Sequence, residues 1–150
     1  MSTVIRPEVS RKNPYHISKH RYYELKHFCL QYPEWRKACL ELSNGVQKTV
    51  VRPDEVKQQS LYSDPTGEAV IKLEMYKRLI EIVEEAVEDT KTDIEVFLLR
   101  SVTEGLSYTY LHTSLGIPCG KRYFYETYRR FWWVLDKKRD KNYTAYSRRT

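Results

Sequence analysis

The stretch that decides the fold is residues 93–138, which read DIEVFLLRSVTEGLSYTYLHTSLGIPCGKRYFYETYRRFWWVLDKK. Apolar residues recur at helical spacing in three segments, and the segments are separated by Gly105 and Gly116. Glycine tolerates the left-handed backbone of a helix end, so each glycine is a natural stop. We therefore predict three helices, with Asp93 as the cap or first-turn acid of the first and Ser107 as the cap of the second.

The last two of these helices have the pattern of a helix-turn-helix. Residues 111–117 read LHTSLGI, in which the two leucines pack the first helix, Gly116 turns the chain and Ile117 fills the corner between the helices. His112 stands where a small residue usually lets the helices approach. The apolar face resumes only at Phe124, which predicts a connection longer than usual. An ordinary pair of antiparallel helices has the same pattern.

The final helix is predicted to have an apolar face and a basic one. The apolar face consists of residues at spacings of 4, 7 and 11: Phe124, Tyr128, Phe131 and Leu135. The predicted DNA-binding residues are Lys121, Arg122, Tyr125, Arg129 and Arg130. Arginine near the start of such a helix reads guanine, whereas later arginines hold phosphates. At this density, aromatic residues such as Tyr123, Tyr125 and Trp133 pack first of all in a core or an interface.

Composition places the chain among folded all-α proteins. It has 150 residues, 41% of them hydrophobic, and only 5 glycines, and it lacks turn-rich strand patterns. The net charge of +6 is unevenly distributed, because residues 1–52 carry +6, residues 53–120 carry −7 and residues 121–150 carry +7. A basic segment fused to a helix-turn-helix is typical of a protein that binds the phosphate backbone. Basic tails that only aid solubility are the alternative.

The N-terminal third is predicted to contain an arm, a helical hairpin and a linker. Residues 1–17 are basic, contain two prolines and lack periodicity, so we predict a flexible basic arm. Residues 18–43 are predicted to form a hairpin in which Ser18 caps the first helix and Pro33 starts the second. Asn44 and Gly45 end that helix, and residues 44–62 are the linker between subdomains.

A long central helix is predicted from residue 63 to residue 89. The segment SDPTGE at 63–68 is a strong start, because it offers caps, a first-turn proline and an acid. A coiled-coil-like seam follows, formed by Ala69, Leu73, Tyr76, Ile80, Val83 and Val87. The seam packs within the chain or pairs residues 65–89 of two copies into a homodimer. With the three helices above, this helix forms a domain over 63–138, and residues 139–150 are predicted to be a flexible basic tail.

The chain lacks the residue patterns that are typical of several functional classes. The sequence has no Gly-rich phosphate loop, no nucleophile elbow and no HExxH motif, so we predict no enzyme and no cofactor. His16 and His20 have i, i+4 spacing, but no partner pair at ligand spacing follows, so we predict no metal site. Three cysteines without a CxxC motif and the absence of a long apolar run predict a cytoplasmic protein that does not enter a membrane.

Three segments in this order resemble a known family. They are RYYELK at 21–26 with QYPEW at 31–35, SDPT at 63–66, and GIPC at 116–119 followed by Phe124-Tyr125 and Arg129-Arg130-Phe131. The order resembles the ArpU/RinA-like late transcriptional regulators of phages and prophages of Gram-positive bacteria. The C-terminal part of that family is similar to region 4 of a sigma factor. The resemblance implies a promoter-reading helix-turn-helix, with Lys121, Arg122, Tyr125, Arg129 and Arg130 on the helix that reads DNA.

Three functional hypotheses follow. In the first, the chain is a DNA-binding regulator of phage late genes in the cytoplasm of a bacterial host, with double-stranded DNA and host RNA polymerase as partners. In the second, it is a DNA-packaging protein, the small subunit of a phage terminase, which works as a ring. In the third, it is a helical adaptor that binds only protein through its acidic helix, and it shows no salt-sensitive affinity for DNA.

Overall fold

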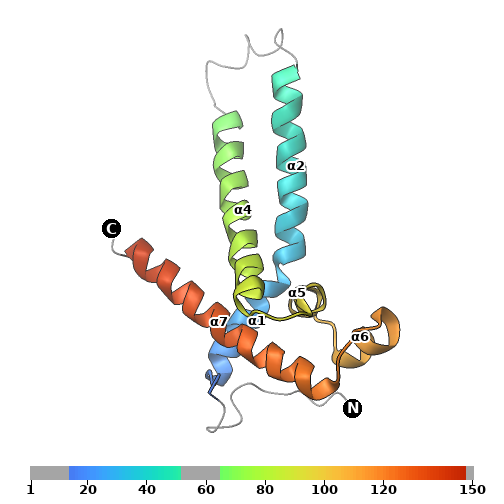
Figure 1. The fold of residues 1–150 in the computed structure, drawn as a ribbon. Coiled ribbons are helices and arrows are strands. Elements are labelled where there is room, and N and C mark those ends of the chain that lie inside the picture. Colours follow the sequence, from blue (N-terminus) through green and yellow to red (C-terminus); the bar gives the residue numbers. More distant parts are fainter. Residues whose placement is uncertain (1–13, 52–64, 148–150) are drawn as a thin grey trace. The chain divides into compact units, whose positions relative to one another are not determined.

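The computed structural model describes residues 14–51 and 65–147 of the chain (Figure 1). These residues form helices and no strand, which confirms the all-α prediction. The helices are α1 (Lys19–Leu30), α2 (Tyr32–Val51), α4 (Pro65–Asp89), α5 (Glu95–Glu104), α6 (Tyr108–Leu115) and α7 (Lys121–Ser147). Within the described part of the chain, no helix has both the length and the apolar character needed to cross a membrane.

The chain divides into two compact units. Unit 1 comprises Met1–Gln31 and Ile82–Thr150, and unit 2 comprises Tyr32–Glu81. Helix α1 therefore belongs with the C-terminal helices, and α2 belongs to the other unit. The prediction that residues 18–43 form one hairpin is not confirmed.

Aromatic rings join α1 to α7 inside unit 1. Trp132 of α7 is fully buried, and its ring meets the ring of Tyr22 edge-on at 5.5 Å. The hydroxyl groups of Tyr22 and Tyr128 are 2.9 Å apart, at hydrogen-bond distance. Cys29 of α1 is also fully buried, and α1 packs against α5 as well as α7. Residues from the two ends of the chain thus share one core.

Polar contacts extend this pairing of α1 with α7 beyond the predicted end of the final helix. Arg21 donates to Asp136 at 2.5 Å and to Asp140 at 2.9 Å, and Arg139 lies over the ring of Phe28 at 4.1 Å. The prediction of a flexible tail over 139–150 is wrong up to Ser147, because α7 continues to that residue. The contacts of Asp136, Arg139 and Asp140 with α1 favour this longer helix.

The last third of α4, from Ile82 to Asp89, enters the core of unit 1. Helix α4 begins at Pro65, so the predicted caps before it lie outside the described residues. Its end at Asp89 agrees with the prediction. From Ile82 onward the apolar residues are buried, with Val83 and Ala86 at 0% exposure. The seam therefore packs within the chain at this end, whereas its members from Ala69 to Ile80 are only half-buried.

Two predictions for the N-terminal third are corrected. Helix α2 starts one residue before Pro33, as its first turn allows, but it continues through Asn44 and Gly45 to Val51. Asn-Gly therefore does not stop this helix, and the predicted linker is helical in its first part. Its remainder, 52–62, lies outside the described residues. At the end of the predicted arm, Ile17 is buried at 5% exposure.

Unit 2 has few buried apolar side chains among its described residues. Tyr32 and Trp35 are buried at 5% exposure each. Where burial is described, the remaining apolar side chains of α2 and of the first part of α4 are half-buried or exposed. Four large ones are exposed by 42–71%: Leu40, Val70, Ile71 and Met75. Leu40 also lines an open hollow between the two helices. The helical pair of α2 and the first part of α4 therefore leaves apolar side chains in contact with water.

Candidate nucleic-acid interface

A turn from Gly116 to Gly120 joins α6 to α7 in unit 1. The Ser107 hydroxyl accepts a hydrogen bond from the backbone N–H of Tyr110, which confirms the predicted cap. Gly116 has a φ of 66°, the left-handed conformation, as its sequence position predicts. The N–H of Ile117 then donates to the carbonyl of Leu111 at 3.0 Å, which closes the end of α6. Because glycine has no Cβ, Gly116 adopts this left-handed conformation at little steric cost and ends α6.

A small apolar core holds the two helices of the turn together. Its buried members are Ile94 before α5, Leu111 of α6, Ile117 of the turn and Phe124 of α7. Each of them is exposed by 4% or less. Leu111 and Ile117 are therefore buried between the helices, as the 111–117 pattern predicts. Leu115 is partly buried and packs against the same core.

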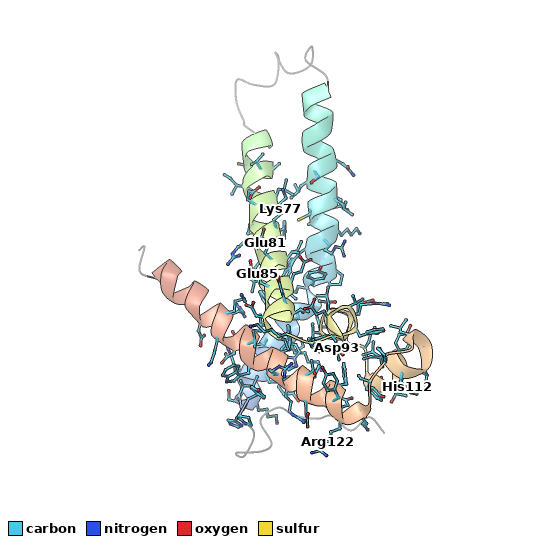
Figure 2. All side chains as sticks on the ribbon, in the orientation of Figure 1. Lys77, Glu81, Glu85, Asp93, His112 and Arg122 are labelled. Carbon is cyan, nitrogen blue, oxygen red and sulfur yellow. The ribbon has the colours of Figure 1, made fainter. Side chains whose placement is uncertain are left out.

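His112 does not obstruct the approach of α6 to α7. Its side chain is exposed on α6 and points outward, where it stacks beside the ring of Tyr108 at 5.7 Å (Figure 2). The expectation that this residue occupies the helix–helix contact is wrong, because the neighbouring Leu111 fills that place. The connection from Gly116 to Gly120 is long, as expected, and its last part is held when the Tyr108 hydroxyl donates to the Cys119 carbonyl at 2.7 Å.

Two of the predicted DNA-binding residues stand at the start of α7. Lys121 is exposed, and the side chain of Arg122 is 93% exposed. Figure 2 shows Arg122 pointing away from the helices. Its Nε lies 3.4 Å from the carboxylate of Glu126 one turn later, an exposed pair that contributes little to stability. Arg122 is therefore available to an anionic ligand.

Two further predicted residues lie between the surface and the core. Arg129 is half-buried and is seven residues after Arg122, so both arginines lie on the same side of α7. Tyr125 is half-buried, packs against the small core and meets the ring of Phe124 edge-on at 5.0 Å. The structure thus brings Arg122 and Arg129 into one row and places Tyr125 beside the core.

Arg130 binds the protein's own backbone. Its Nε donates to the carbonyl of Thr90 at 3.0 Å, and its Nη2 donates to the carbonyl of Lys91 at 3.4 Å. These carbonyls follow the end of α4 at Asp89. A guanidinium group at this position satisfies acceptors that the helix leaves open.

Asp93 contacts α7 instead of capping α5. The N-cap of α5 is Ile94, and it makes no side-chain cap hydrogen bond. The hydroxyl of Tyr123 donates to the Asp93 carboxylate at 2.8 Å and lies 3.2 Å from the hydroxyl of Thr92. Thr92 in turn accepts from the N–H of Ile94 at 3.4 Å. The predicted cap is wrong, because the carboxylate binds a residue thirty positions later.

Helix α7 also carries a cation–π pair that was not predicted from the sequence. Trp133 is half-buried, and the Lys137 ammonium lies over its ring at 3.5 Å. The ring of Tyr15 meets Trp133 edge-on at 5.4 Å. The i, i+4 spacing of Trp133 and Lys137 is the signal from which this pair could have been predicted.

Burial and ion pairs shift several pKa values in unit 1. Burial raises the pKa of the Cys29 thiol far above its usual range. Burial, together with the neighbouring Tyr22 hydroxyl, raises the pKa of Tyr128. Burial opposes the charge of Lys138, but its hydrogen bonds to Asp89 at 2.8 Å and Glu85 at 3.3 Å outweigh burial and raise its pKa. None of these groups lies in the row of Arg122 and Arg129.

The described residues contain no group of three side chains that could hold a metal ion. Comparison of the chain with protein-family models, with curated proteins and with solved structures finds no match.

Proposed function

We propose that this protein is a DNA-binding transcriptional regulator that acts through α6, the turn and α7. The observation that supports the proposal most is the row formed by the exposed Arg122 and the half-buried Arg129 on the helix that follows a closed, well-packed turn. A helix held in this way presents its outer side to the major groove of double-stranded DNA. Arginine supplies planar, bidentate donors for guanine and for phosphate.

The contacts are divided along α7. Lys121 and Arg122 stand in the first turn, from which the side chains of a recognition helix reach base edges. Arg129 is two turns further along and holds a phosphate. Tyr125 lies between them, and its half-buried ring supports the helix while its hydroxyl binds the backbone.

The regulatory role rests on the resemblance to late regulators of phages and prophages. It places the protein in the cytoplasm of a bacterial host, with RNA polymerase of the host as a further partner. The packaging protein and the protein-binding adaptor differ from the regulator in measurable properties, namely ring assembly and the absence of DNA affinity.

A homodimer through unit 2 fits a regulator that binds two half-sites. The exposed apolar side chains Leu40, Ile71 and Met75 lie in this unit. Residues 32–81 contain eight Lys/Arg and eight Asp/Glu, so the unit has no net charge and the whole excess of +6 belongs to unit 1. Two copies of a neutral unit do not repel each other, whereas two copies of unit 1 do.

The test of DNA binding starts from the full chain and a random duplex library. Duplexes retained by the protein are sequenced, and affinity for the enriched duplex and for a scrambled one is measured by fluorescence anisotropy between 50 and 300 mM salt, roughly the range in which phosphate contacts dominate. A regulator prefers the enriched duplex, and its log affinity falls linearly with log salt. Arg122→Ala with Arg129→Ala should make the slope shallower by about 0.9 for each lost phosphate contact.

The other outcomes decide between the remaining functions. Salt-sensitive binding without preference, together with an octamer or larger ring in sedimentation, favours the packaging protein. Absence of binding at low salt rejects DNA recognition altogether and leaves the adaptor. A dimer that Ile71→Glu converts to monomer supports unit 2 as the dimer surface, and an unchanged dimer argues against it.

A further inference from the structure

Two side chains of α7 bind the short connector between α4 and α5. Tyr123 and Arg130 are seven residues apart, so they project from the same side of the helix. Tyr123 donates to the Asp93 carboxylate at 2.8 Å, and Arg130 donates to the carbonyls of Thr90 and Lys91 at 3.0 and 3.4 Å. Residues 90–93 are therefore held at two points, two turns apart along α7.

The connector is a place where such contacts are needed. The last carbonyls of α4 have no partner within the helix, and they form its negative end. Lys91 has a φ of 52°, a left-handed conformation that side chains other than glycine rarely adopt. Lys138 adds a second cation near the same helix end, since its ammonium group lies 2.8 Å from Asp89. Three residues of α7 thus align it along the end of α4.

The connector contacts and the row of Arg122 and Arg129 occupy different sides of α7. Consecutive residues of an α-helix are separated by about 100° around its axis, so Arg129 and its neighbour Arg130 point in different directions. Arg130 projects toward the connector with Tyr123, and Arg129 projects with Arg122, whose side chain is 93% exposed. Within the described residues, Arg129 has no hydrogen bond or ion pair through its side chain.

We infer that Arg130 is a positioning residue that fixes α7 on the connector at residues 90–93 and makes no phosphate contact. The inference rests on the proposed DNA binding and refines it, because the phosphate contacts of the outer side then belong to Arg129 and not to both adjacent arginines. Because the guanidinium of Arg130 is directed to the carbonyls of Thr90 and Lys91, reaching a phosphate on the side of Arg122 and Arg129 would draw it away from them. The Thr90 carbonyl, at a part-buried contact, and the exposed Lys91 carbonyl would then lose a charged donor.

Adjacent arginines provide a matched comparison. Arg129→Gln and Arg130→Gln remove the same charge one residue apart, and affinity for the enriched duplex is measured over the same salt series. Arg129→Gln should lower the slope of log affinity against log salt by about 0.9. Arg130→Gln should change the slope by less than about 0.3. It should nevertheless weaken binding at every salt concentration, by roughly tenfold, because the recognition helix loses its position.

A second readout uses the free protein and does not depend on DNA. In Arg130→Gln, amide hydrogen exchange of α7 from Tyr123 to Arg130 should accelerate, and the melting temperature should fall by roughly 3 °C. Arg130→Lys should recover part of both effects, since an ammonium group can donate to one of the two carbonyls. Arg129→Gln should leave both quantities unchanged. If Arg130→Gln does not fold, Tyr123→Phe removes the other contact and is measured in its place.

The two proposals fail in different ways. If the wild-type protein binds no duplex, DNA recognition is rejected, while exchange and melting still decide whether Arg130 fixes α7. In the opposite case, Arg130→Gln makes the slope of log affinity against log salt shallower by the amount expected for one phosphate contact, and amide hydrogen exchange of α7 stays as in wild type. Arg130 then contacts DNA, and the positioning role is overturned.

Discussion

The hydroxyl of Tyr108, the first residue of α6, donates a 2.7 Å hydrogen bond to the carbonyl oxygen of Cys119, two residues before α7 begins. This bond spans the connection from one helix to the next. It complements the backbone bond from Ile117 to Leu111 at 3.0 Å, which closes only the α6 end. The direction in which α7 leaves the turn is therefore set by a side chain as well as by the glycine.

Replacement of Tyr108 by phenylalanine should loosen this turn. Tyr108→Phe keeps the ring against the small core and leaves the part-buried Cys119 carbonyl without its donor. We expect the free energy of unfolding, measured by urea denaturation, to fall by about 1 kcal/mol. Tyr110→Phe, at a side chain that is 45% exposed, is the control and should change stability by less than about 0.5 kcal/mol. Equal effects of the two variants would contradict a role for the bond.

Removal of the Ile117 side chain should be more costly. This residue is 4% exposed among Ile94, Leu111 and Phe124, so Ile117→Ala leaves a cavity between the helices of the turn. The expected loss is about 2–4 kcal/mol in the free energy of unfolding. Ile71→Ala, at a side chain that is 71% exposed, should lose less than about 0.5 kcal/mol in monomeric protein. A small loss at Ile117 would mean that the turn is not part of the cooperative core.

Glycine at position 91 should stabilise the protein. Lys91 adopts a φ of 52° at an exposed site, where a side chain costs about 1 kcal/mol relative to glycine. Part of the gain is offset by the larger conformational entropy of glycine in the unfolded chain, so we expect Lys91→Gly to add roughly 0.5 kcal/mol. Thermal unfolding measures the difference. Lys91→Ala retains the strained backbone and should show no gain, which separates backbone strain from loss of charge.

Stability should decline in alkaline solution. Burial raises the pKa of Cys29 in the folded protein, whereas in the unfolded chain the thiol ionises near pH 8.5. Above that pH the unfolded state binds fewer protons than the folded state, so the free energy of unfolding falls as pH rises, by up to about 1.4 kcal/mol per pH unit. The stability that comes from keeping the Cys29 thiol protonated is fully present below about pH 8.5, the pKa of the unfolded thiol.

Substitution of the buried thiol tests the origin of this decline. Urea denaturation of Cys29→Ala between pH 8 and 10, roughly the window given by the thiol and phenol pKa values, should show a shallower fall than wild type. Cys39→Ala removes a half-buried thiol from unit 2 and serves as the control with wild-type pH dependence. If Cys29→Ala retained the full decline, other groups such as the buried Tyr128 hydroxyl would be its source.

The parts of the fold that could be predicted depend on contacts between near neighbours. Ser18 and Ser107 cap helices by binding an N–H three residues later, and Gly105 and Gly116 end helices through their own backbone. Such signals lie within a few residues of the sequence. The helix class and most helix boundaries follow from them.

The contacts that could not be predicted join distant residues. Arg130 binds the carbonyl of Thr90 across forty positions, and no periodicity distinguishes it from Arg129 next to it. From the sequence, the carboxylate of Asp93 could accept a hydrogen bond either from a backbone N–H at the start of α5 or from a distant side chain. The packing of α7 provides the hydroxyl of Tyr123 as the donor. Burial of Trp132 against Tyr22 likewise depends on the pairing of α1 with α7. Local patterns therefore identify a candidate DNA-binding row without separating contact residues from supporting ones.

The composition of unit 1 from both ends of the chain has a consequence for synthesis in the cell. Helix α1 leaves the ribosome before α7, and Tyr128 and Trp132, the partners of its Tyr22, are made more than one hundred residues later. Until α7 emerges, α1 can pack only against the earlier helices of unit 1 such as α5, so the core of this unit is completed late in translation. A fragment limited to residues 93–138 would lack α1 and the end of α4, and therefore one side of its core, which makes α5, α6 and α7 alone poor candidates for transfer to another protein.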